Sequence, residues 1–494
     1  MPDHFGLIAM LFMSVPLLGL LINNIFKRET AGKFCLNLGI GVALLQIGAA
    51  VLMMMIMFFN HKDHVDFSLF WDMSARPDAA YFRADMLSLA VILTIGTVML
   101  VSLLKASSTM AGNEQRQTLN FSNLLYTVVL GMNGIALVND LFSLYVFIEI
   151  AGISSFLLIA LFKDKRGLEG AFKYLAMSAI ASAFLLGSLA LIFMETGSLQ
   201  FDTAAELLKN WKNDAHPVLL LLAFVFFVSA VSIKTGLAPF HGWLPDAYQS
   251  APPAVSVLLG GIVTKACGAY AVMRILANVF KGVGNTNMIF SMLALGSIIF
   301  GSVAAIGQSD FKRMLAYSSI SQIGYIVLGA ACGNVLGLAG AVFHFFNHAV
   351  FKTTLFVNAA VMEKRAGTTD IENMEGLRGK MPMAGFSSLL AFLSAAGIPP
   401  LAGFWSKLLI ILAVWKTGHM LFASAALFAT IFTMAYFLRL QRKVFFGKPA
   451  ESAAGIIEVK DSLFLAEALM SCLTVGFGLG FPVLLLFLQA RGLF

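Results

Sequence analysis

The chain of 494 residues is 59% hydrophobic and only 12% charged, with a formal net charge of +7. Its many runs of 18 or more apolar residues exclude a soluble globular enzyme and predict an all-α polytopic protein in the lipid bilayer. The positive charge does not indicate a nucleic-acid partner, because lysine and arginine in membrane proteins concentrate in the cytoplasmic loops.

Apolar windows of about 20 residues predict about fourteen transmembrane helices. In chain order these are 5–26, 34–59, 85–104, 121–139, 141–162, 170–194, 217–235 with a broken continuation to 249, 254–280, 287–307, 314–333, 336–361, 383–415 with a break near Pro399, 420–446 and 463–489. The first of them lacks a basic n-region and a small-residue cleavage site, so we expect a retained span rather than a signal peptide.

No pattern of cofactor ligands is visible in this sequence. The four cysteines form no CxxC pair, which argues against metal clusters and framework disulfides and predicts packing roles; they are Cys35, Cys267, Cys332 and Cys472. Nucleotide-binding loops and haem motifs are missing as well, so we expect any redox centres to belong to partner subunits.

The basic residues predict the orientation. When the first loop (Lys27, Arg28 and Lys33) is placed in the cytoplasm, most of the other lysines and arginines of the loops fall on that side as well. Both termini are then expected outside. Five basic residues remain inside predicted spans: Lys234, Lys265, Arg274, Lys352 and Lys407.

Weak internal matches predict an inverted repeat, a common plan of transporters. Asp140 and Gly197 match Asp310 and Gly367, 170 residues later, and the Gly-x-x-Pro break at Gly236 matches that at Gly397. The predicted division is an N-terminal segment 1–120, two five-helix repeats at 121–280 and 287–446 with broken helices 7 and 12, and a C-terminal helix within 463–494.

Lys234 stands directly before the first break, at the end of a strongly apolar run. Intramembrane charge is costly, about 2.5–3.5 kcal/mol on insertion scales, and indicates a functional site. Glu149, near the middle of the fifth span, is its candidate partner, because a pair allows both groups to stay charged. Proton exchange between them is the functional hypothesis. Snorkelling of the lysine, or a static ion pair, is the structural alternative.

His344, His348 and Lys352 recur at i, i+4 and i+8, so they share one helix face. The ordinary pKa of histidine suits a proton relay. Hydrogen-bonded packing and metal binding are the alternatives, although no acidic or cysteine ligand accompanies them on that helix.

The remaining candidates lie near small residues or near the breaks. Lys265 follows a Gly-Gly-Ile-Val-Thr run and is expected to link the two repeats, while Lys407 follows the second break. His241 and Asp246, in the first broken segment, are either relay groups or local hydrogen-bond partners. Lys173, Asp310, Lys312 and Arg313, near span ends, are expected to be loop or structural charges.

Together these motifs resemble the antiporter-like subunits shared by respiratory complex I, Mrp-type sodium/proton antiporters (D-type subunit) and membrane-bound energy-converting hydrogenases. The resemblance covers essentially the whole chain. It is carried by Asn139 to Glu149, Lys234 to Ala247, Ser309 to Tyr325, His348 to Lys352 with Gly367 to Ile371, and Gly397 to Lys407.

The resemblance implies two half-channels joined by a buried relay. Glu149 and Lys234 would load one half-channel, Lys265 would be the bridge, the His344–His348–Lys352 stripe the central relay, and Lys407 the end of the second half-channel. One branch of the family carries glutamate at the last position, so Lys407 argues against that branch.

The function expected from the resemblance is proton translocation, in an NADH:quinone oxidoreductase-like or hydrogenase complex or in an Mrp-type antiporter that also moves sodium. The chain alone is not expected to be catalytic. Expected partners are homologous antiporter-like subunits, small membrane subunits and a hydrogenase-like or quinone-reducing peripheral arm, in a bacterial or archaeal cell membrane. Secondary sodium/proton antiport without redox coupling, and inorganic-carbon uptake with a soluble zinc enzyme, are the alternatives.

Overall fold

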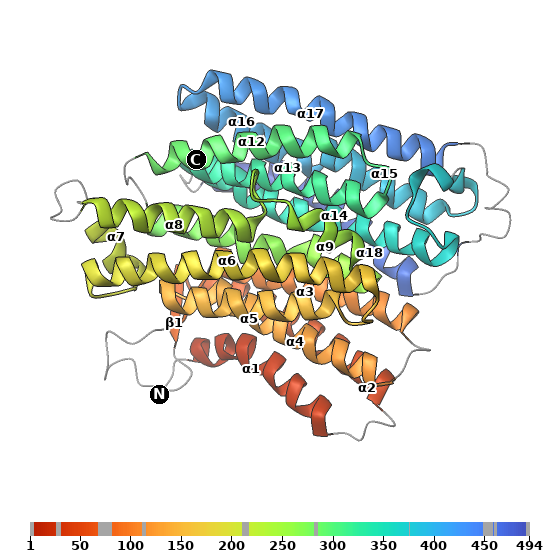
Figure 1. Cartoon of the computed structure of the whole chain (residues 1–494), viewed down its shortest axis with the longest axis horizontal. Helices are drawn as coiled ribbons and strands as arrows, with labels where there is room; N and C mark the ends of the chain where they lie inside the picture. The colour runs from red at the N-terminus through yellow and green to blue at the C-terminus, as the bar shows by residue number, and fades with distance from the viewer. Residues whose placement is uncertain are drawn as a thin grey trace. The chain divides into compact units, whose positions relative to one another are not determined.

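The computed structural model describes residues 4–25, 31–67, 82–110, 115–209, 217–280, 285–374, 376–447, 458 and 462–490. Helices dominate this part of the chain (Figure 1). It divides into two compact units, each of which is described by itself. Unit 1 comprises Met1–Leu103, Met110–Thr235 and Ile262–Val283, and unit 2 comprises Leu104–Thr109, Gly236–Gly261 and Gly284–Phe494.

Unit 1 is a helix bundle with a small hairpin at one end. Its elements are α1 (His4–Ile25), α2 (Ala31–Phe59), β1 (His64–Phe67), β2 (Phe82–Asp85), most of α3 (Met86–Thr109), α4 (Gln115–Leu137), α5 (Leu141–Ile159), α6 (Lys165–Thr196), α7 (Phe201–Lys209), α8 (Pro217–Thr235), the π-helical η3 (Lys265–Tyr270) and α11 (Ala271–Asn278). Asp140 and Asp164 are the N-caps of α5 and α6, because each side chain accepts a hydrogen bond from a backbone N–H group of the first turn.

Unit 2 is also a bundle, with α14 packed between several neighbours. Its elements are α9 (Trp243–Ser250), α10 (Pro253–Leu258), α12 (Thr286–Ile306), α13 (Phe311–Ala331), α14 (Val335–Ala366), the short η4 (Ile371–Asn373) and η5 (Leu377–Gly379), α15 (Pro382–Ala396), α16 (Ala402–Lys416), α17 (Met420–Leu440), η6 (Gln441–Phe445) and α18 (Ser462–Ala490). A further π-helical stretch, η2 (Leu259–Val263), continues α10. Helix α14 contacts α13, α15, α16 and α18.

Within the described residues, twelve helices are long and apolar enough to cross a membrane. Helices occupy all fourteen predicted spans, but two of these do not meet that criterion. Helix α4 carries Gln115, Arg116 and Asn120 in its first turns, and the predicted span 383–415 is split into α15 and α16 of 15 residues each. The predicted class, an all-α membrane protein with broken helices, is confirmed.

The local geometry recurs at the predicted offsets. Asp140 pairs as a β-bridge with Gln200, and Asp310 pairs in the same way with Asp370. Gly197 and Gly367 end the following long helices in the left-handed conformation. Gly236 and Gly397, both at positive φ, end α8 and α15 at the two breaks. The boundaries of the two repeats stay a prediction, because the compact units divide the chain differently.

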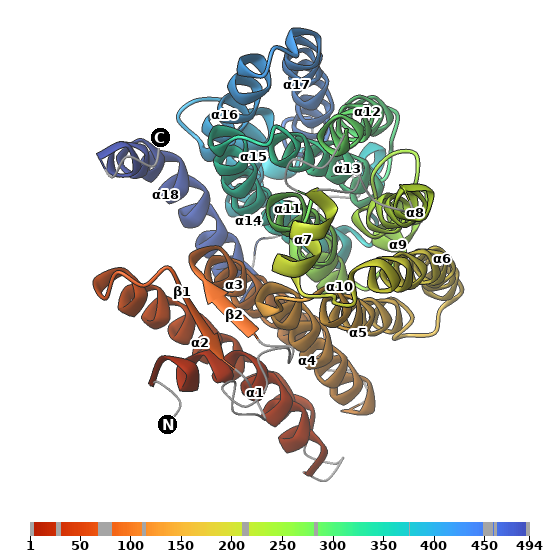
Figure 2. The ribbon, with the colours of Figure 1, turned by 90° about the vertical axis from the view of Figure 1, so that its left-hand side faces the viewer.

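The antiparallel hairpin of unit 1 was not predicted. Strands β1 and β2 pair His64 with Asp85 and Phe67 with Phe82, and β1 lies against α1 (Figure 2). Each strand has four residues, which is too short for a clear apolar alternation.

The predicted orientation depends on the lysines and arginines of the loops. Some of these residues lie outside the described ranges, as do both chain ends; they are Lys27, Arg28, Arg76, Lys212, Lys281 and Arg491.

Candidate functional site

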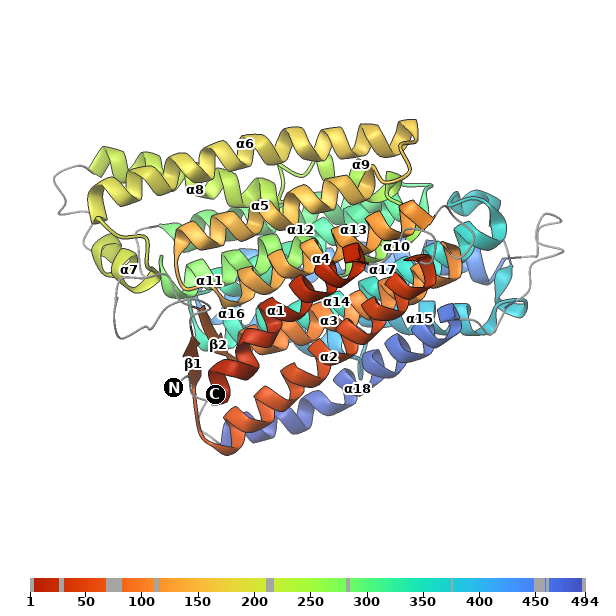
Figure 3. The same cartoon turned by 90° about the horizontal axis from the view of Figure 1, so that it is seen from below.

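Glu149 and Lys234 meet in unit 1, as their positions predict. The Lys234 Nζ atom lies 2.7 Å from Glu149 Oε1, and the lysine side chain is only 4% exposed. Helix α6, which lies alongside both α5 and α8 (Figure 3), adds two serines to the pair. Lys234 donates to Ser178 Oγ at 2.7 Å, and Ser182 donates to Glu149 Oε1 at 2.6 Å. Both charges are therefore paired and hydrogen-bonded.

Lys265 lies on a helical segment that packs directly beside this pair. The segment η3 contacts α5 and α8, and the Lys265 side chain is completely buried. Gly268 makes this approach possible, because a Cβ atom there would stand 2.5 Å from the Cα of Thr235, the residue that follows Lys234. The structure thus brings the segment of Lys265 against both helices of the Glu149–Lys234 pair.

In unit 2, His344 and His348 are stacked along α14. Their ring centroids lie 6.2 Å apart with an interplanar angle of 9°. The two ring nitrogens of His344 contact Ser406 Oγ at 2.8 Å and Gln322 Oε1 at 3.2 Å, and both histidines are buried. Across the described ranges no group of three His, Cys, Asp or Glu residues is arranged to hold a metal ion.

The two lysines of unit 2 that were predicted as site residues, Lys352 and Lys407, are held by backbone and hydroxyl oxygens. Lys352 donates to the carbonyl of Leu315 at 2.7 Å and contacts Ser318 Oγ. Lys407 donates to the carbonyl of Ala395, one residue before α15 ends at the second break, at 2.7 Å. A broken helix leaves such carbonyls free of their usual partners, which makes them acceptors for an ammonium group.

One face of α13 contacts three of the four predicted site residues of helices α14 and α16, namely His344, Lys352 and Lys407. Ser318, Gln322 and Tyr325 stand at i, i+4 and i+7, so they share a helix face. Ser318 contacts Lys352, and Gln322 contacts His344. The Nζ atom of Lys407 lies over the ring of Tyr325, 4.9 Å from the ring centroid. Sequence reasoning missed these residues, together with Ser178, Ser182 and Ser406. Polar residues at helical spacing inside apolar runs were the available signal.

The described side chains of the first broken segment make packing contacts and an ion pair with neighbouring helices. The ring of His241 packs against Phe300 and Tyr317, with ring centroids 4.4 Å and 6.4 Å away. Asp246 pairs with Arg313 at 2.5 Å, and Gln249 accepts from the same guanidinium at 3.1 Å. These contacts favour the local role over the relay role for Asp246.

Three buried charges of unit 2 were not among the predicted site residues. Lys105 is completely buried and donates to the carbonyl of Ala360 at 3.0 Å, although its position was predicted to be a loop. Lys312 pairs with Glu363 at 2.6 Å, as expected for a structural charge. Glu467 of α18 is only 2% exposed. The helix ends extend further than the apolar windows, so the windows missed Lys105.

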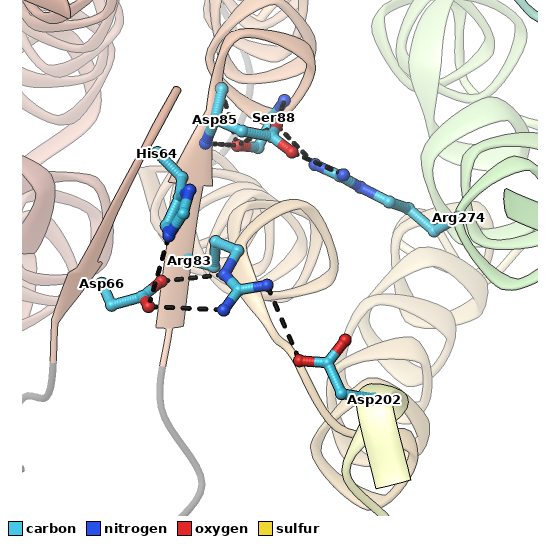
Figure 4. A network of polar contacts seen from close by, with 7 residues as sticks. All are labelled: His64, Asp66, Arg83, Asp85, Ser88, Asp202 and Arg274. Atoms are coloured by element: carbon cyan, nitrogen blue, oxygen red, sulfur yellow. Dashed lines mark hydrogen bonds and ion pairs between the residues drawn. The ribbon is translucent and has the colours of Figure 1, made fainter. Parts of the chain in front are cut away.

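Arg274, the fifth intramembrane basic residue, is bound in unit 1. Its guanidinium makes two hydrogen bonds of 2.6 Å to the Asp85 carboxylate, next to Arg83 and Asp66 of the hairpin (Figure 4). Burial raises the pKa of Asp85, but the hydrogen bonds and charge of Arg274, together with the bonds from Ser88, lower that pKa by more. The carboxylate is therefore held in its charged form.

Comparison with known proteins identifies the family. Residues 138–433 match the model of the NADH:quinone oxidoreductase/Mrp antiporter transmembrane family. The NADH-quinone oxidoreductase subunit N of Desulforudis audaxviator is 36% identical over 359 residues, which cover 72% of this chain and 71% of that protein. The D-type subunit of the Na(+)/H(+) antiporter of Alkalihalophilus pseudofirmus is 33% identical over 366 residues, with coverage of 74% and 73%.

Solved structures agree with this assignment. A chain of the membrane-bound sulfane sulfur reductase, an archaeal respiratory membrane complex, has a TM-score of 0.87 and 28% identity, with coverage of 98% of this chain and 96% of that chain. A chain of the Mrp complex from Dietzia has a TM-score of 0.85 and 24% identity, with coverage of 97% and 96%, and so shares the fold. The chain therefore belongs to the NADH:quinone oxidoreductase/Mrp antiporter transmembrane family, as an antiporter-like membrane subunit.

Proposed function

We propose that the chain moves protons along its buried charged groups. In unit 1 the carriers are Glu149, Lys234 and Lys265, and in unit 2 they are His344, His348, Lys352 and Lys407, with His241 as a further candidate. The Glu149–Lys234 ion pair of 2.7 Å is the observation that supports this most directly, because it joins a proton-binding acid and base inside apolar helices.

The physical basis is the coupling of charges in a medium of low dielectric constant. The negative charge of Glu149 stabilises the ammonium group of Lys234 while the two lie close together, so movement of Glu149 away from Lys234 removes that stabilisation and favours release of the lysine's proton. The proton would then pass toward Lys265, whose segment packs on the same helices. Ser178 and Ser182 stabilise the paired state and so set the cost of opening it.

The energy source is expected to be a partner protein. The relatives named above are subunits of larger membrane complexes, which supports partner subunits for this multi-pass membrane protein. We propose a cell-membrane complex in which homologous antiporter-like and small membrane subunits, with a hydrogenase-like or quinone-reducing arm, supply the driving force and any redox centres. A subunit inventory of the purified complex by mass spectrometry distinguishes this arrangement from a sodium/proton antiporter without such an arm.

The direct test is Lys234→Ala in the assembled complex. We expect normal assembly and a loss of coupled proton transport, measured with a pH-sensitive dye in membrane vesicles. Removing one member of a buried pair costs about 3–5 kcal/mol. The double variant Glu149→Gln/Lys234→Met therefore controls for instability, since it leaves no unpaired charge. Normal transport by either assembled variant would contradict the proposal.

A further inference from the structure

Unit 1 contains a polar pocket that the mechanism above does not use. It has a volume of about 450 Å³, and its lining residues range from Asp63 to Asn278 and include Arg83, Asp85, Asp202, Arg274 and Ala277. These residues come from the hairpin, the start of α7, the end of α11 and the connection between α4 and α5. At about 30 Å³ of liquid volume per water molecule, the pocket has room for on the order of ten waters.

Charged side chains of both signs form its walls (Figure 4). Arg83 lies 2.9 Å from Asp66 and 3.9 Å from Asp202, and Arg274 binds Asp85 through two hydrogen bonds. The lining has three aspartates and two arginines, and both arginines are paired with carboxylates, so charges of opposite sign lie close together along the wall. Hydration, rather than the binding of a charged ligand, is what this lining favours.

Burial increases stepwise from the pocket into the helix bundle. The Asp85 side chain is 23% exposed, that of Arg274 is 16% exposed, and Tyr270 and Lys265 are completely buried. Arg274 Nε donates to the Tyr270 hydroxyl at 2.6 Å, and that hydroxyl donates to the Ala136 carbonyl at 2.8 Å. A continuous set of polar contacts therefore leads inward from the pocket wall to Tyr270.

The π-helical segment η3 connects Tyr270, at its end, with Lys265, at its start. Hydrogen bonds from i to i+5 bring residues five apart onto one helix face, and π-helical turns often occur at functional sites. Lys265 and Tyr270 stand five apart within η3, whereas Tyr270 and Arg274 stand four apart at the return to α-helix. Lys265, Tyr270 and Arg274 thus follow one another along one face.

We propose that this pocket is a third aqueous access route, through which protons reach or leave Lys265 by way of the Tyr270 hydroxyl. A hydronium ion that enters from the pocket gives a proton to the hydroxyl oxygen of Tyr270 and becomes water, while the hydroxyl turns from the Ala136 carbonyl and releases its own proton to the neutral amine of Lys265. The tyrosine is neutral before and after, and the lysine becomes an ammonium group. The Arg274–Asp85 pair closes the inner wall to larger cations. The inference rests on the proposed function, because it takes Lys265 as a proton carrier.

The first experiment removes one oxygen atom. Tyr270→Phe keeps the buried ring and loses the hydroxyl, so coupled proton transport should fall about tenfold or more, as expected when a positioned proton-transfer group is lost. Tyr248→Phe is the matched control. Its hydroxyl is also buried and donates to a backbone carbonyl, that of Leu259 at 2.9 Å, but it belongs to unit 2, whereas Tyr270 and the pocket belong to unit 1. Transport by Tyr248→Phe should equal that of the unmodified complex.

The second experiment blocks the pocket and leaves Tyr270 in place. In a Cys472→Ser background, which removes an exposed thiol, Ala277→Cys is labelled with a bulky, membrane-impermeant thiol reagent. Transport should fall in proportion to labelling. Glu206→Cys, on the exposed side of α7 and outside the pocket lining, should be labelled without loss of transport.

The outcomes separate this inference from the proposed function. Full transport by assembled Tyr270→Phe, or by fully labelled Ala277→Cys, overturns the access route. When Lys234→Ala abolishes transport in the same preparations, the proposed function stands and only the route fails. When Lys234→Ala also transports normally, the proposed function itself fails.

Discussion

Hydroxyl groups determine how lysines are held inside these helices. Lys234 and Lys352 each contact a serine in addition to a carboxylate or a carbonyl, and His344 contacts Ser406. A serine is small enough to fit between helices, and its hydroxyl both donates and accepts. Such residues stabilise a charged partner without adding a charge, so they should control the energy needed to separate the Glu149–Lys234 pair.

Ser182→Ala should therefore raise the rate of proton transport, because loss of this hydrogen bond lowers the energy needed to separate the Glu149–Lys234 pair. The hydrogen bond to a charged acceptor is worth about 1.5–3 kcal/mol, so we expect a change of roughly tenfold in transport by the assembled complex. Ser155→Ala is the control, because this buried serine of α5 donates to the carbonyl of Ala151 in its own helix and does not contact the ion pair. Equal rates for the two variants would show that Ser182 has no role in proton transfer.

The Asp85–Arg274 ion pair should make unit 1 sensitive to acid. The pKa of Asp85 lies below its ordinary value of 3.8, so the pair contributes stability above that value and loses the contribution as the pH falls through the lower folded pKa. We expect the melting temperature to fall in this acidic range. Asp85→Asn should lower the melting temperature at neutral pH and weaken its dependence on acid. An identical acid profile for both proteins would contradict the prediction.

At the scale of elements, close contacts at glycines place the functional helices. The segment that carries Lys265 approaches the end of α8 at Gly268, and α13 approaches α12 at Gly301 and Gly324, where a Cβ atom would stand 2.6 Å and 2.7 Å from backbone atoms. Helices in a bilayer pack through such small residues, because the lipid chains are as apolar as the side chains.

Gly268→Ala should separate η3 from α8. The new Cβ atom would lie 2.5 Å from the Cα of Thr235, and overpacking of this kind costs about 1–3 kcal/mol. We expect a lower melting temperature and reduced transport. The control is Gly41→Ala in α2, where no atom lies within 4 Å of the added Cβ and stability should be unchanged or slightly higher. Equal melting temperatures for the two variants would rule out tight packing at Gly268.

At the scale of the whole molecule, function depends on which way the chain crosses the membrane. The distribution of lysine and arginine predicts that both termini lie outside. Alternation of the spans along the chain then places the loop before α6 in the cytoplasm and the end of α16 outside. By the same alternation, the connections that line the polar pocket lie outside, so the pocket would open to that side.

Cysteine labelling tests that orientation. In the Cys472→Ser background, Lys416→Cys at the end of α16 should react with an impermeant thiol reagent in intact cells. Lys165→Cys at the start of α6 should react only in inverted vesicles. Both positions are exposed, so accessibility within the protein does not limit the reaction. The reverse pattern would place the termini and the pocket in the cytoplasm.

Much of this protein could be predicted from sequence, because the bilayer restricts the possible structures. Continuous apolar runs require helices, a glycine and prolines interrupt them at Gly236 and Gly397, and a charge such as Glu149 or Lys234 stands out against an apolar background. These features depend only on the order of residues. The helices, both breaks and the pairing of Glu149 with Lys234 were therefore predictable.

Only the tertiary structure decided which polar residues face these charges. Ser182 and Ser155 are both serines within apolar helices, yet one meets Glu149 and the other meets its own backbone. The difference depends on how each helix is rotated about its axis and packed on its neighbours. The pocket likewise combines residues from Asp63 to Asn278. Composition and periodicity describe one segment at a time, whereas a site formed between segments depends on how they pack.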